Sequence, residues 1–79
     1  MARITYFVAL PFTEDEDGHL VPGEPAEAQS ASSATSRARS LAERGAGALA
    51  FSRTGDPNFG EFDPAVILAR FGRTPEELE

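Results

Sequence analysis

Large apolar side chains alternate with polar or small ones along the first part of the chain. Within residues 3–12, every second position on one side is apolar: Ile4, Tyr6, Val8, Leu10 and Phe12. This alternation, rich in aromatic and β-branched residues, predicts a strand. Pro11 has no N–H to donate, so we expect it at an edge or at the strand's end. Residues 19–29 contain two prolines and can return only as a short, irregular edge strand.

The apolar pattern then changes to a helical one. Residues with small or aliphatic side chains recur at spacings of three and four: Ala31, Ala34, Ala38, Leu41 and Ala42. Ser30 is a good N-cap, and Gly45 stands where a C′ glycine ends a helix. The spacing therefore predicts one helix whose apolar stripe is narrow enough for close packing on a sheet.

Residues 47–53, "GALAFSR", predict a second main strand, with Leu49, Phe51 and Arg53 on one side of it. The turn-rich residues 54–60 and the return strand at "GEF" complete a hairpin, across which Arg53 and Glu61 could pair. Residues 64–71 fit two structures. Pro64 at a first helical position suggests a second short helix, whereas the unbroken apolar run favours a strand, which we prefer.

The elements add up to an α+β fold with a ββαββ-like layout, in which one main helix covers one face of a small sheet. With 79 residues, the chain is expected to form a single small domain, 1–79, with a frayed tail at 74–79.

Composition narrows the classes of function. The chain has no Cys, which excludes disulfides and thiolate metal sites and suits a cytoplasmic location. No secretion signal is recognisable at the start, and no apolar run of about 18 residues predicts a membrane span. The formal net charge of −6 repels polyanions.

The acidic stretch 13–24, "TEDEDGHLVPGE", has partial calcium-loop spacing, with Asp15, Asp17 and Glu24 at the third, fifth and twelfth positions. Thr13 occupies the position of the first carboxylate, and prolines rather than helices flank the loop. We therefore expect a hairpin turn without a tight metal site, and weak cation attraction remains an alternative. His19 is the single His, so a zinc site of the usual kind is not expected.

The sequence does not point to catalysis. The serines gather on the helix, where a solvated face is the simpler interpretation, and no phosphate-binding glycine motif is present. Asp56 paired with Glu61 or Asp63 could transfer protons only within a cleft. We expect no enzyme activity, no catalytic residue and no cofactor.

The segments "AFSRTGDP", "GEF" and "ILARFG", together with "YFVALPF" and "DEDG", resemble a family of small bacterial proteins of uncharacterised function. The resemblance covers most of the chain. It implies no activity, cofactor or site, and it suggests that the sequence is a complete small protein.

By elimination, the sequence predicts an acidic binding module that contacts an unknown protein partner or forms a homodimer. The candidate interaction surface combines residues of the second strand with arginines of the helix: Leu49, Phe51, Arg53, Arg37 and Arg39. The alternative is a nucleic-acid-binding regulator that uses the Arg-rich middle of the chain, with phenylalanines as stacking faces. The net charge argues against that alternative.

Overall fold

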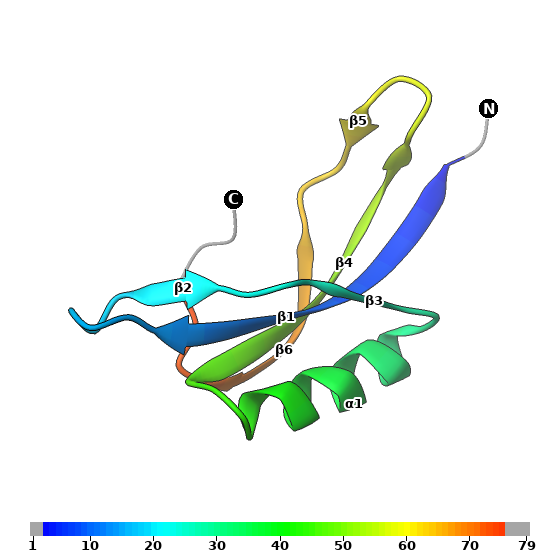
Figure 1. The fold of residues 1–79 in the computed structure, drawn as a ribbon. Helices are drawn as coiled ribbons and strands as arrows, with labels where there is room; N and C mark the ends of the chain where they lie inside the picture. The colour runs from blue at the N-terminus through cyan, green and yellow to red at the C-terminus, as the bar shows by residue number, and fades with distance from the viewer. Residues whose placement is uncertain (1–2, 76–79) are drawn as a thin grey trace.

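A computed structural model describes residues 3–75 as a twisted antiparallel sheet with one helix on one face (Figure 1). The two long strands, β1 (Ile4–Glu14) and β4 (Gly47–Asp56), pair along nearly their whole length at the centre of the sheet. Both carry the alternating pattern seen in the sequence, which lets each present a different set of side chains to each face.

Each outer strand of the sheet is divided into two pieces. On the β1 side lie β2 (Leu20–Pro22) and β3 (Ala26–Ala28), and on the β4 side lie β5 (Glu61–Phe62) and β6 (Val66–Gly72). Pro22 and Pro25 flank the break between β2 and β3, as expected for residues that cannot donate to a ladder. The α+β class is confirmed. The ββαββ layout holds loosely, because the two outer strands are interrupted.

Residues 66–72 are a strand, which confirms the preferred interpretation over a second short helix. Asp63 does not cap a helix. Its carboxylate accepts a hydrogen bond from Arg3 at 2.6 Å, and its N–H donates to the carbonyl of Thr54. Pairing with β4 shifts register between Ala50 and Phe51, so one extra residue of β6 is accommodated there as a bulge.

The helix α1 (Ala31–Ala42) begins where the sequence predicts. Ser30 is extended and its hydroxyl accepts a hydrogen bond from the N–H of Ser33 at 3.1 Å. The prediction that Gly45 ends the helix as a C′ glycine was wrong, because Gly45 does not adopt a positive φ. Its lack of a side chain instead permits a close approach, since a Cβ there would lie 2.8 Å from the carbonyl oxygen of Phe12.

The fully buried part of the core between helix and sheet consists of alanines, and larger side chains such as Phe7, Leu68 and Phe71 pack around it. Ala34 and Ala38 of the helix stripe are fully buried, and they pack against Ala9, Ala48 and Ala50 of the central strands. Leu41 and Ala42 are partly buried beside them, whereas Ala31 is exposed and does not belong to the core stripe. Methyl groups on both sides bring the helix backbone close to the sheet, as the predicted stripe indicated.

The sheet is longer than the helix that covers it. The start of β1, the end of β4 and β5 extend past the helix as an arm, and the molecule measures 44 × 24 × 18 Å (Figure 1). The face of the arm on the helix side is polar: the hydroxyls of Thr5 and Thr54 lie 2.8 Å apart, and Arg3 pairs with Asp63. The predicted tail 74–79 lies mostly outside the described residues. Arg70 donates hydrogen bonds to Thr74 Oγ1 and to the carbonyl of Pro75.

Candidate interaction surface

The face of the sheet opposite the helix carries a second set of apolar side chains. Because Ala48 and Ala50 contact the helix, the alternating residues Leu49, Phe51 and Arg53 lie on the opposite side. The cross-strand register adds the neighbours of these residues to that side. We call the uncovered part of it the open face, formed by Ile4, Tyr6, Val8, Phe51, Arg53, Phe62 and Ile67.

Leu49 does not contribute exposed area to the open face, contrary to its place in the predicted surface. It is fully buried, although it lies on the side away from the helix. Its cross-strand neighbours are Leu10 and Arg70, and Arg70 holds Thr74 and Pro75 through its guanidinium. The segment after β6 therefore lies near the Leu49 end of this side, and the exposed apolar area is confined toward the arm.

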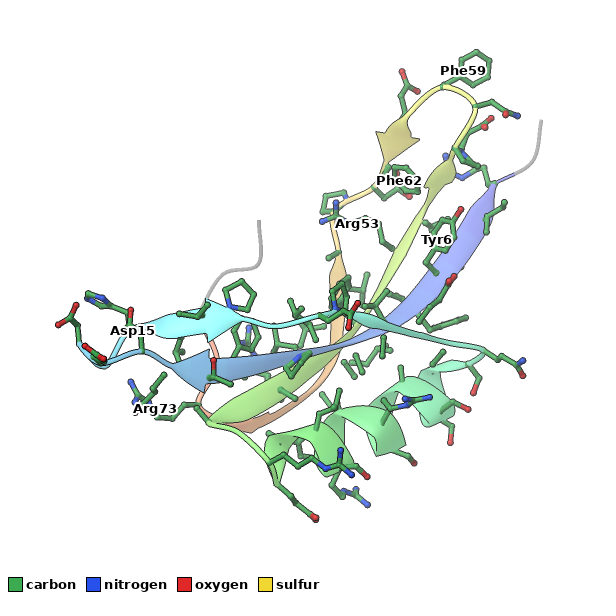
Figure 2. All side chains as sticks on the ribbon, in the orientation of Figure 1. Tyr6, Asp15, Arg53, Phe59, Phe62 and Arg73 are labelled. Carbon is green, nitrogen blue, oxygen red and sulfur yellow. The ribbon has the colours of Figure 1, made fainter. Side chains whose placement is uncertain are left out.

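The arm end of the open face is aromatic (Figure 2). Phe62 lies opposite Gly55 in the β4–β5 ladder, and its ring occupies the space that a side chain at Gly55 would need. The rings of Tyr6 and Phe62 are 6.0 Å apart between centroids and tilted by 47°. Phe62 remains 39% exposed. Phe62 was not predicted to belong to the surface. Gly55 opposite it could have indicated this, because an aromatic ring often covers a glycine on the neighbouring strand.

The predicted pair of Arg53 and Glu61 does not form, because the hairpin has a different register. Glu61 lies opposite Asp56, whereas Arg53 lies opposite Tyr6 on the other neighbouring strand. The side chain of Arg53 is half-buried, and its Nε atom is shielded without a hydrogen-bond acceptor among the described residues. A shielded donor without an acceptor is costly. The Nη groups of Arg53 are not shielded, and they are the part of the guanidinium that a binding partner could reach.

The other two predicted surface residues lie on the opposite side of the molecule. Arg37 and Arg39 are exposed on α1, and the guanidinium of Arg39 lies 5.5 Å from the centroid of the Phe71 ring. Arg37 lines a shallow hollow of about 390 Å³ along the outer face of the helix, together with Ser32, Ser33, Ser36 and Ser40. The five predicted residues therefore do not form one surface, because the sheet separates the helix arginines from Phe51 and Arg53.

The acidic stretch is a hairpin turn between β1 and β2. Asp15 Oδ1 accepts hydrogen bonds from the N–H groups of Asp17 and His19, both at 2.9 Å, and Gly18 has a φ of 84°. Asp15, Asp17 and His19 have ligand atoms within 4.8 Å of one another, and all three are exposed. Glu24, the twelfth residue of the calcium-loop spacing, is not part of that group. The hairpin turn therefore accounts for the Asp and Gly residues of this stretch without a bound metal.

Replacing Asp15 by alanine should lower the free energy of unfolding by about 1 kcal/mol, because two backbone N–H groups lose their acceptor. Asp17→Ala serves as the matched control, since Asp17 contributes only its backbone N–H. Urea unfolding measures both. We expect micromolar calcium to leave the unfolding midpoint of the parent protein unchanged, since a ligand that binds the folded state would raise it. A calcium-dependent increase that Asp15→Ala abolishes would establish a metal site instead.

One pair of carboxylates lies in a hollow. Asp56 and Glu61 face each other across the β4–β5 ladder, and with Arg3 and Phe59 they line a hollow of about 310 Å³. Asp56 is largely buried, and its carboxylate accepts a hydrogen bond from the N–H of Asn58, which stabilises the turn. Among the described serines, the only side-chain hydrogen bonds link Ser30 to Ser33, so no serine is paired with a base. These residues offer no assembled nucleophile.

No described helix is long and apolar enough to cross a membrane. The open face is the apolar surface that the helix leaves uncovered in residues 3–75, with Arg53 among aromatic and aliphatic side chains. Comparison of the chain with protein-family models, with curated proteins and with solved structures gives no match, so the sequence resemblance stays a prediction.

Proposed function

We propose that this protein is a small binding module without catalytic activity, and that the open face is its interface with another protein chain. The observation that carries the proposal is the mismatch between one helix and a sheet with two apolar faces. The helix buries the alanine face, while Tyr6, Val8, Phe51 and Ile67 on the other side are only half-buried.

The apolar area of the open face and the small size of the chain both support an interface on this side. Large contiguous apolar patches are uncommon on monomeric proteins and usually mark interaction sites. A domain of 79 residues buries a small share of its surface, so covering the open face would add stability that its alanine core cannot supply. Tyr and Arg, which dominate the energetics of protein interfaces, both occur here, at Tyr6 and Arg53.

Nucleic-acid binding is the second candidate, and the distribution of arginines argues against it. Arg37 and Arg39 lie on the helix, Arg53 lies on the opposite side, and Arg73 forms an ion pair with Glu14. A net charge of −6, without one continuous basic surface across residues 3–75, provides little of the counterion release that drives binding to phosphates.

Site-specific cross-linking in the native cell tests the proposed interface. We expect p-benzoylphenylalanine in place of Tyr6 to give covalent adducts with a protein chain on irradiation, because the ring lies on the open face. The same photoreactive residue in place of Ser36, which is exposed on the outer face of the helix, is the matched control. Adducts at Ser36 but not at Tyr6, or none at either position, would contradict the proposal.

A further inference from the structure

The open face carries charges of both signs in fixed positions. Glu27 of β3 lies opposite Val8 in the register, and its neighbours Ala26 and Ala28 are the half-buried residues of that strand. Ala28 packs against the helix core, so the alternating Glu27 belongs to the side of the open face. Glu27 is exposed, and no ion pair or hydrogen bond engages its carboxylate among the described residues.

One row of residues crosses the whole face at this level. In it Glu27, Val8, Phe51 and Ile67 lie side by side on β3, β1, β4 and β6. Arg53 lies on β4, two residues beyond Phe51 along the strand. The face therefore has an acid on its β3 edge, an apolar centre, and the guanidinium of Arg53 on its β4 side.

This arrangement is self-complementary. When two sheets face each other across a two-fold axis parallel to their strands, the β3 edge of each copy lies over the β4–β6 side of the other. Face-to-face sheets pack about 10 Å apart with strands within about 30° of alignment, a gap that a glutamate and an arginine span together. Each Glu27 would then lie within reach of Arg53 of the other copy, while Val8 and Phe51 pack at the centre.

We infer that the occupant of the open face is a second copy of this chain, and that Glu27 of each copy pairs with Arg53 of the other. The inference rests on the proposed function and names its partner. Arg53 is the cation for this pairing, because its Nη groups are not shielded and no described residue accepts a hydrogen bond from them. Arg70 on the same side already donates to Thr74 and Pro75. The Glu27 carboxylate of the second copy would accept hydrogen bonds from the Nη groups of Arg53, because these groups, unlike Nε, are open to a partner.

Charge reversal tests the pairing. Light scattering after size exclusion, over a series of concentrations at physiological salt, should show a concentration-dependent dimer of the parent protein. Glu27→Arg alone and Arg53→Glu alone should each raise the dimer dissociation constant at least about 100-fold. The two-fold dimer contains the contact twice, and either substitution puts two like charges into both copies of it. An equimolar mixture of the two variants should recover a dimer within about tenfold of the parent affinity, since every contact then joins opposite charges.

Folding of each variant is checked by circular dichroism and thermal unfolding. Glu27 is exposed on a short edge strand, so Glu27→Arg is expected to fold. If Arg53→Glu does not fold, Arg53→Gln replaces it in a double-mutant cycle with Glu27→Gln, in which the double variant should lose no more affinity than either single one.

Three results would overturn the pairing: a parent protein that is monomeric throughout, single variants that dimerise like the parent, or a mixture that stays monomeric. A monomer whose position 6 cross-links to a different protein would overturn the second copy and leave the proposed function standing. A dimer whose dissociation constant is unchanged by both substitutions would refute only the Glu27–Arg53 contact.

Discussion

Replacing Gly47 by alanine is expected to unfold the protein or to remove at least about 3 kcal/mol of stability. Gly47 is the first residue of β4, and it lies between Phe12 of β1 and Gly72 of β6. A methyl group there would lie within 2.6 Å of the N atom of Arg73 and of the carbonyl oxygen of Phe71. These are backbone atoms of β6 and of the residue that follows it, so no side-chain rotation can relieve the overlap. Chains of this size rarely have more than about 5 kcal/mol of stability to lose.

Urea unfolding followed by circular dichroism measures this effect. Gly60→Ala is the matched control, because Gly60 has a φ of 67° but no atom within 4 Å of a built Cβ. It should lose about 1 kcal/mol through the left-handed backbone alone. Equal losses for the two variants would mean that the contact between β4 and β6 at Gly47 is not as close as described.

Replacing Ala38 by leucine should lower the free energy of unfolding by about 1–3 kcal/mol, although leucine favours helices. Ala38 has no exposed surface, and the buried residues of its cluster are Ala9, Ala34, Ala48 and Ala50. Alanine methyl groups cannot change rotamer to admit a larger neighbour. The helix itself would have to move away from the sheet, which opens the contacts of the other alanines.

Thermal unfolding should show a lower midpoint for Ala38→Leu, by about 4–8 °C for each kcal/mol lost in a domain of this size. Ala31→Leu is the control on the same helix. Ala31 is exposed, so the change should stay within about 0.5 kcal/mol. A more stable Ala38→Leu variant would show that the helix–sheet interface holds unfilled space.

Local chemistry made several features predictable from the sequence. Ser30 caps the helix, Gly18 supplies a positive φ in the acidic turn, and Asp15 closes that turn with its own carboxylate. Each of these interactions joins residues within four positions of each other, so the residue types alone specify them. The alternation of residues 47–53 also separated Leu49, Phe51 and Arg53 from Ala48 and Ala50, and the small alanines are the ones that contact the helix.

Pairings between distant segments were not predictable in the same way. Arg53 was expected opposite Glu61, but the length of the β4–β5 turn places Asp56 there. Leu49 was expected on an exposed surface, but it is fully buried, and Arg70 beside it in the ladder donates hydrogen bonds to Thr74 and Pro75. Gly45 was interpreted as a left-handed helix stop, whereas the carbonyl of Phe12, from a strand far away in sequence, is the reason for glycine.

The sequence by itself determined the helix, the two long strands and the alternating character of each face, because hydrophobic periods and caps act over a few residues. Only the tertiary structure decided that the helix arginines and Arg53 lie on opposite sides of the sheet, and that Glu27 lies on the same face as Arg53. These relations depend on register and on which strands become neighbours. Register is a property of paired segments, and no single segment contains it.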